Sequence, residues 1–207
     1  HFSNAIVSHA MRQTAIQFYS QGLTIEGVLS TPNDAASKSG VVVVCHPHPV
    51  LGGDMDSPLV VAICNAIGQH DLATLRFNFR GVKGSEGQFS NGPGEQDDLA
   101  AAMTAMSRWP GIDRKRMGVA GYSFGAGVVI GALPILKAPK GLAAVAPPIS
   151  TVRSISERIN RPTLLISGTE DRVSPSVSLQ RELDHVSGPV KFKEVQGADH
   201  LLAGYEE

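Results

Sequence analysis

The stretch RMGVAGYSFGAGVVIGALPIL, residues Arg116 to Leu136, decides the fold. An apolar run with β character leads into G-Y-S-F-G at 121–125, and an apolar run with helical spacing follows. A serine in this context lies on a sharp, strained turn, with small neighbours that let strand and helix pass closely. The turn lifts the hydroxyl toward unpaired N–H groups at the helix start. The pattern predicts that Ser123 is a nucleophile, although the same letters would fit a glycine-rich turn whose serine only caps a helix.

Short runs rich in Val, Ile, Leu and Phe alternate with segments of helical spacing on both sides of this turn. The strand candidates are 40–46, 73–79, 116–122, 141–147, 162–168 and 190–196, and the helix candidates are 58–70, 94–109, 123–136 and 174–186. This alternation predicts right-handed βαβ crossovers, and therefore an α/β fold with a mostly parallel central sheet and helices on both faces.

The chain is expected to form one domain over residues 1–207, with 1–12 outside the fold and no large cap domain. Two further strand candidates, 14–19 and 23–30, predict an N-terminal hairpin. The segment 147–161 is the one sizeable insertion point, and it is long enough only for a loop or a single helix.

Composition excludes several classes of partner. The 207 residues include 18 Lys and Arg against 19 Asp and Glu. The chain therefore has no excess of positive charge that would attract nucleic acid, and a small neutral substrate is more consistent with this balance than a polyanion. The longest apolar runs are far shorter than the roughly 20 residues that span a bilayer. The N-terminus lacks the pattern of a signal peptide, which favours the cytoplasm.

Cys45 and Cys64 lie in apolar segments and are expected to be buried, unreactive thiols. The oligomeric state stays open.

A serine hydroxyl becomes a good nucleophile when an imidazole takes its proton and a carboxylate orients that imidazole. His200 is the expected base, because it follows the strand 190–196 through a short loop and stands where open α/β sheets place their sites. His70 and His185 lie in or near helices and are expected at the surface. His1 and His9 belong to the terminal segment.

Asp171 is the expected acid, since it lies on the loop after the strand 162–168. Glu170 is the alternative; adjacent side chains point in different directions, so only one should face the imidazole. Asp199 is a poorer candidate, because an immediate neighbour can rarely bend back to the ring of His200. The order Ser123, Asp171, His200 is the order in which α/β-hydrolases carry their nucleophile, acid and base.

The turn H-P-H-P at 46–49 follows the strand 40–46 and is expected to supply half of an oxyanion hole. Proline has no N–H, so the donor should be His48 or a residue from Val50 onward; the other donor should be the N–H of Phe124. Tyr122, Val50 and Leu51 flank these turns and are the expected substrate contacts.

Two further polar groups have competing interpretations. His46 and His48 with Asp54 or Asp56 could form a metal site, but this would leave Ser123 unexplained, so no metal is predicted and His46 is expected to be a buried brace. Arg80 could bind a substrate carboxylate. Pairing of Arg80 with one of the acidic residues Glu95, Asp97 and Asp98 is preferred.

Three motifs in register give the chain a family resemblance: HPHP-x-x-GG at 46–53, RFNFRGV-x-x-S-x-G at 76–87 and GYSFGAG at 121–127. Over residues 23–202 the chain resembles small α/β-hydrolases with little or no lid, related to dienelactone hydrolases and to serine peptidases of the prolyl-oligopeptidase type. The resemblance implies a hydrolase that uses Ser123, Asp171 and His200.

The chain departs from these relatives at three points. Lys83-Gly84 stands where relatives tend to have the glycine one place earlier. Dienelactone hydrolases use a cysteine nucleophile, whereas position 123 is Ser, so their substrate is not implied. Relatives usually close with a full helix, whereas this sequence has seven residues after His200.

The sequence therefore predicts a cofactor-free serine hydrolase that cleaves small carboxylic esters through an acyl-enzyme. An uncapped, shallow site predicts short acyl groups. A thioesterase or a peptidase could use the same three residues. Two other classes stay open, a metal-dependent hydrolase and a ligand-binding protein that keeps the hydrolase fold without turnover.

Overall fold

A computed structural model describes residues 11–33, 38–137, 139–154 and 159–205 and places their strands in one sheet. The sheet has eight strands in the order β1-β2-β4-β3-β5-β6-β7-β8. The strands are β1 (Met11–Ser20), β2 (Leu23–Pro32), β3 (Ser39–Cys45), β4 (Ala73–Phe77), β5 (Ile112–Tyr122), β6 (Leu142–Val145), β7 (Thr163–Gly168) and β8 (Val190–Val195). The helices are α1 (Pro58–Gly68), α2 (Pro93–Arg108), α3 (Phe124–Ala132), α4 (Ile149–Arg153) and α5 (Ser176–Leu183), with a 3₁₀ turn η1 (Pro49–Leu51).

The predicted N-terminal hairpin is present and longer than expected. β1 and β2 pair antiparallel from Met11 opposite Pro32 to Ser20 opposite Leu23, and β2 pairs antiparallel with β4. The pairs from β4 through β3 to β8 are all parallel. Residues 11 and 12 were expected outside the fold, but backbone pairing with the end of β2 makes them part of β1. His1 and His9 lie outside the described residues.

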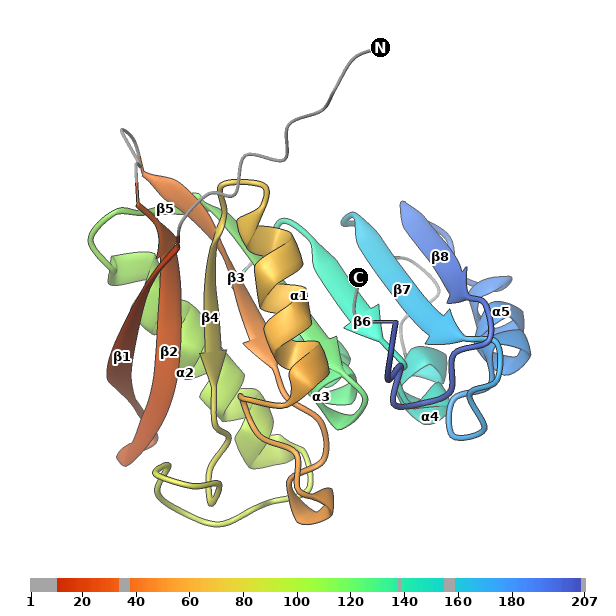
Figure 1. Cartoon of the computed structure of the whole chain (residues 1–207), viewed down its shortest axis with the longest axis horizontal. Helices are drawn as coiled ribbons and strands as arrows, with labels where there is room; N and C mark the ends of the chain where they lie inside the picture. Colours follow the sequence, from red (N-terminus) through yellow and green to blue (C-terminus); the bar gives the residue numbers. More distant parts are fainter. Residues whose placement is uncertain (1–10, 34–37, 138, 155–158, 206–207) are drawn as a thin grey trace.

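Helices cover both faces of the sheet, as the alternating pattern predicts. Figure 1 shows α1 in front of the sheet and α2 to α5 behind it. α3 ends at Ala132, earlier than the apolar run to Leu136 predicts, because Pro134 has no N–H with which to continue the helical hydrogen bonds. The insertion 147–161 contributes the single short helix α4, and residues 155–158 lie outside the described part of the chain.

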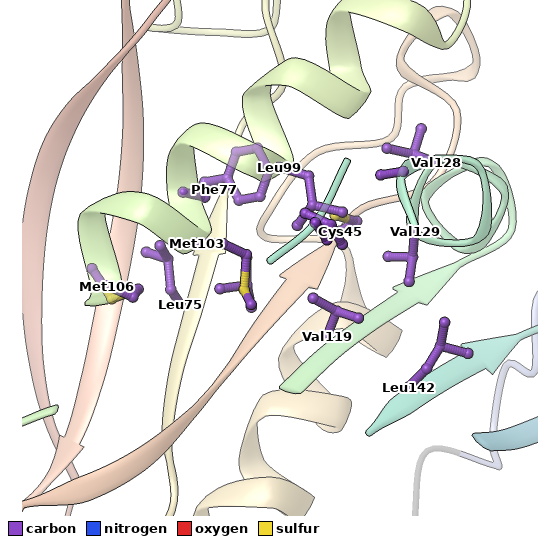
Figure 2. Packing of buried hydrophobic residues seen from close by; sticks show 14 of the residues in the cluster. Cys45, Leu75, Phe77, Leu99, Met103, Met106, Val119, Val128, Val129 and Leu142 are labelled. Carbon is purple, nitrogen blue, oxygen red and sulfur yellow. The ribbon is translucent and has the colours of Figure 1, made fainter. Parts of the chain in front are cut away.

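The main core fills the space between the sheet and the helices α2 and α3 (Figure 2). All five residues of β4 are buried, as expected for a strand covered on both faces. β8, at the edge, alternates half-buried and exposed residues and carries Lys191 and Lys193. Cys45 and Cys64 are buried free thiols, and burial raises the pKa of both, that of Cys64 to about 11. Both thiols are therefore protonated near neutral pH.

The parallel strands end at one edge of the sheet, which gathers the loops after β3, β5, β7 and β8. An open depression of about 870 Å³ lies at this edge beside Asp171 and His200. A separate apolar groove of about 710 Å³ lies over β5 to β8, near Gly118, Gly141 and Pro162 at the other ends of the strands. In the described part of the chain no helix is both long and apolar enough to cross a membrane.

Candidate active site

Ser123 occupies a strained turn between β5 and α3. Its backbone has φ 53° and ψ −116°, a conformation that costs a non-glycine residue roughly 1–3 kcal/mol. The Ser123 N–H donates to the carbonyl of Val145 on β6 at 2.8 Å, which holds the turn against the neighbouring strand. A Cβ atom on Gly121 would overlap the carbonyl of Gly125, and one on Gly125 would overlap the carbonyl of Cys45. Both glycines are therefore required for the close passage of strand and helix.

His200 lies within hydrogen-bond distance of the serine. The Nε2 atom of its ring is 2.8 Å from Ser123 Oγ, and its side chain is 18% exposed. Gly197 and Ala198 hold the loop before His200 against the loop after β7: the Gly197 N–H donates to Thr169 Oγ1, and the Ala198 carbonyl accepts from the Glu170 N–H. The structure thus places the histidine next to Ser123, as the sequence predicts.

Asp171 is the carboxylate that faces the imidazole. Its Oδ2 lies 2.8 Å from His200 Nδ1, and its Oδ1 accepts the N–H groups of Val173 and Ser174 at 2.8 and 2.7 Å. The Asp171 side chain is fully buried. Because both oxygens of this carboxylate are hydrogen-bonded, it holds one fixed orientation toward the ring.

The two other acidic candidates do not face the ring. Glu170 is exposed, and Asp199 is exposed and accepts the N–H of Leu201 through its side chain. His70 and His185 are also exposed, and His185 lies just beyond the end of α5.

The arrangement can carry a proton relay. A carboxylate next to Nδ1 favours the tautomer with the proton on that nitrogen, which leaves Nε2 as an acceptor for the serine proton. An imidazolium formed when Nε2 takes this proton would lie against the negative charge of Asp171.

The turn after β3 leaves one backbone donor available. Within it, the N–H of Val50 is bonded to His48 Nδ1, those of Leu51 and Gly53 to the His48 carbonyl, and that of Gly52 to Pro49. For the N–H of His48, and likewise that of Phe124, the described part of the chain provides no hydrogen-bond partner. Of the donors that the sequence leaves open in this turn, only His48 keeps its N–H free.

The side chains of His48 and Phe124 pack against each other and against the ring of Phe89. The rings of His48 and Phe124 have centroids 5.0 Å apart, and Phe89 lies 5.1 Å from the first and 5.5 Å from the second. All three side chains are half-buried. Phe89 was not predicted as a site residue; the sequence offers only an aromatic residue in a glycine-rich loop that also contains Phe79.

His46 supports the same turn from the core. Its Nδ1 is 2.7 Å from the Pro47 carbonyl, and its Nε2 accepts the N–H of Phe79 at 3.1 Å. Burial lowers the pKa of His46 to about 4, so the ring is neutral near pH 7. The prediction that His46 is a buried residue that supports this turn is confirmed. Both ring nitrogens are occupied, and no group of three or more His, Cys, Asp or Glu among the described residues could hold a metal ion.

The three expected substrate contacts differ in placement. Val50 and Leu51 on η1 are 70% and 85% exposed at the edge that carries Ser123. Tyr122 is 5% exposed, and its hydroxyl donates to the His200 carbonyl at 2.9 Å. Its ring therefore supports the histidine loop and does not line open space.

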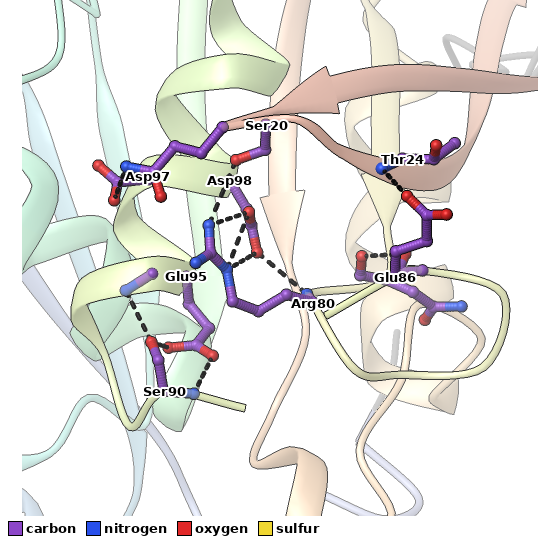
Figure 3. A network of polar contacts seen from close by, with 12 residues as sticks. Ser20, Thr24, Arg80, Glu86, Ser90, Glu95, Asp97 and Asp98 are labelled. Carbon is purple, nitrogen blue, oxygen red and sulfur yellow. Dashed lines mark hydrogen bonds and ion pairs between the residues drawn. The ribbon is translucent and has the colours of Figure 1, made fainter. Parts of the chain in front are cut away.

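A polar network fixes the loop after β4 (Figure 3). Arg80 is buried and binds both carboxylate oxygens of Asp98, with Arg80 Nη2 2.8 Å from Asp98 Oδ1. Glu95 accepts the N–H groups of Ser90 and Gly92 and so ties the end of the loop to α2. The prediction that Arg80 pairs with an acidic neighbour is confirmed.

Comparison with known proteins gives the family. A family described as an alpha/beta hydrolase domain matches residues 39–206. An alpha-beta serine hydrolase homologue from Coxiella burnetii is 31% identical, with a TM-score of 0.84 over 96% of this chain and 94% of that one. The protein XC6422 from Xanthomonas campestris, described as an α/β serine hydrolase without lid, is 26% identical, with a TM-score of 0.81 over 94% and 90% of the two chains.

A curated relative, the uncharacterized protein RP471 of Rickettsia prowazekii, is 27% identical over 78% of this chain and 71% of its own length. The chain therefore belongs to the α/β-hydrolase family, and these relatives indicate a hydrolase. The narrower resemblance to dienelactone hydrolases and to peptidases of the prolyl-oligopeptidase type stays a prediction.

Proposed function

We propose that the protein is a serine hydrolase that cleaves small carboxylic esters through an acyl-enzyme. The observation that carries the proposal is the continuous chain of hydrogen bonds from Ser123 through His200 to Asp171, with both contacts at 2.8 Å. A serine that only capped a helix would need neither the imidazole nor the buried carboxylate behind it.

The reaction follows from these positions. Ser123 Oγ attacks the ester carbonyl carbon while His200 Nε2 takes the hydroxyl proton, and the N–H groups of Phe124 and His48 stabilise the oxyanion. The intermediate collapses to an acyl-serine, and the imidazolium returns the proton to the departing alcohol. Water, deprotonated by His200, then attacks the acyl-serine, and the imidazolium returns the proton to Ser123 Oγ as the acid leaves, which restores the free enzyme.

Substrate size is inferred from the open site. No cap domain covers the site in the described residues, and Val50 and Leu51 stand exposed beside it. Such a surface can bury little of a long chain, and short acyl groups fit it best. The substrate is neutral and small, and the reaction requires no cofactor, metal or macromolecular partner.

Labelling with a fluorophosphonate tests the proposal. The wild type should take one label per chain and hydrolyse 4-nitrophenyl acetate and butyrate, and Ser123→Ala should do neither. Parallel assays with thioester and peptide substrates distinguish an esterase from a thioesterase or a peptidase that uses the same three residues. An unlabelled, folded wild type would favour a binding protein, and loss of activity with a chelator would favour a metal-dependent hydrolase.

An ester series measures the acyl preference. Rates per enzyme should fall as the acyl group lengthens, and a preference for chains longer than about ten carbons would contradict the shallow site.

A further inference from the structure

Tyr122 is the residue before Ser123, and its side chain reaches the loop that carries His200. We propose that Tyr122 is a positioning residue that holds His200 in reach of Ser123, an inference that rests on the proposed function. The link is direct: the Tyr122 hydroxyl donates to the His200 carbonyl at 2.9 Å, across 78 residues of sequence.

The loop that carries the base has few other ties on its far side. β8 ends at Val195, and residues 196–205 contain no helix or strand. The hydrogen bonds to the loop after β7 act on Gly197 and Ala198, before the histidine. After it, the backbone N–H groups of Leu202 and Tyr205 bond only within the loop, to Asp199 and Leu202.

The ring of Tyr122 also holds the loop of His200, because it packs with residues before and after the histidine. It belongs to a small buried cluster that includes Ala198 and Leu202, two residues before and two after His200. Its centroid lies 6.0 Å from that of the imidazole. Burial, with a smaller contribution from Asp171 and Asp199, raises the pKa of Tyr122 to about 12, so the phenol stays a donor over the whole range in which an ester hydrolase is assayed.

One rigid dipeptide therefore holds the base at two points. Tyr122 holds the main chain of His200, and Ser123 Oγ meets its ring. Both residues lie at the end of β5, so a displacement of the turn moves the nucleophile and the anchor of its base together. Such coupling preserves a distance on which proton transfer depends steeply.

The variant Tyr122→Phe removes the hydroxyl and keeps the ring. We expect kcat and the rate constant of fluorophosphonate labelling to fall roughly 10- to 100-fold, with KM changed by no more than about two-fold, since the substrate does not touch this hydroxyl. The labelled fraction at completion should stay at one per chain. Tyr205→Phe, in the same loop and 45% exposed, is the matched control and should behave as the wild type.

The outcomes separate the two proposals. A labelled, active wild type with unchanged rate constants in Tyr122→Phe overturns the positioning role alone. A reduced labelled fraction with an unchanged rate constant means that the hydroxyl serves only folding, which also overturns it. A wild type that takes no label and cleaves no ester overturns the proposed function, and the inference with it.

Discussion

Asp171 and His200 meet at 2.8 Å, and the carboxylate reaches this contact already bound to two backbone N–H groups of its own loop. The carboxylate is therefore oriented by its own loop as well as by the imidazole. Glu170, one residue earlier, points into solvent and can make no equivalent contact without rebuilding that loop.

Replacing Asp171 by Asn should lower kcat by roughly 10³- to 10⁴-fold, because an amide no longer selects the imidazole tautomer that accepts the serine proton or stabilises the imidazolium. Steady-state ester hydrolysis measures the loss. Glu170→Gln, at the adjacent exposed carboxylate, is the matched control and should keep near wild-type rates. A large loss in Glu170→Gln with activity retained in Asp171→Asn would reverse the assignment.

Gly125→Ala should destabilise the fold by about 3 kcal/mol or prevent folding, because the added methyl group would overlap a carbonyl of β3 that cannot move away. Gly127→Ala, one half-turn further along α3, meets only side-chain atoms of Thr151 and Pro148 at 3.3 to 3.5 Å and should change stability by no more than about 1 kcal/mol. Urea unfolding of both variants provides the comparison. Equal stabilities would show that the turn does not need the close approach.

The sheet and the placement of Ser123, Asp171 and His200 at one edge of it could be predicted from local patterns. Most strands after residue 39 contain a short apolar run, and Asp171 and His200 each stand a few residues after the end of a strand. Parallel strands end at a common edge, so side chains far apart in the sequence could be assigned to one site without knowing their distances.

The contacts that fix these side chains could not be predicted, because they join distant positions without a local pattern. The bond from Tyr122 to the His200 carbonyl depends on how the last loop packs, and the letters around Tyr122 fit a substrate contact equally well. Phe89 lies in a loop, where no helical or strand periodicity in the sequence indicates which way a side chain faces. The pairing of Met11 with Pro32 extends β1 beyond its apolar residues, since backbone hydrogen bonds do not depend on side-chain type.

Asp98→Asn should destabilise the protein by about 3–5 kcal/mol, since it leaves the buried Arg80 guanidinium without its carboxylate. KM for a neutral ester should stay close to that of the wild type, because Arg80 holds the loop and does not contact substrate. Asp97→Asn, at the half-buried neighbour that binds Gln21, should change stability by only about 0.5 kcal/mol. An Asp98→Asn protein of unchanged stability with a raised KM would point instead to substrate binding by Arg80.

Because the ring of His46 is buried and neutral, the free energy of unfolding should fall at acid pH. Its pKa is about 4 in the folded protein and 6.5 in the unfolded chain, so between these values the unfolded chain binds the extra proton. The stability that the neutral, buried ring contributes is complete above pH 6.5 and is lost as the pH falls toward 4, by on the order of 3 kcal/mol.

His46→Gln tests this dependence, because glutamine can donate and accept hydrogen bonds and does not titrate. The variant should be less stable at pH 7, and its free energy of unfolding should fall less steeply between pH 6.5 and 4 than that of the wild type. Urea unfolding at several pH values gives both slopes. His70→Gln, at an exposed histidine, should keep the wild-type slope, and parallel curves for all three proteins would mean that another group causes the acid sensitivity.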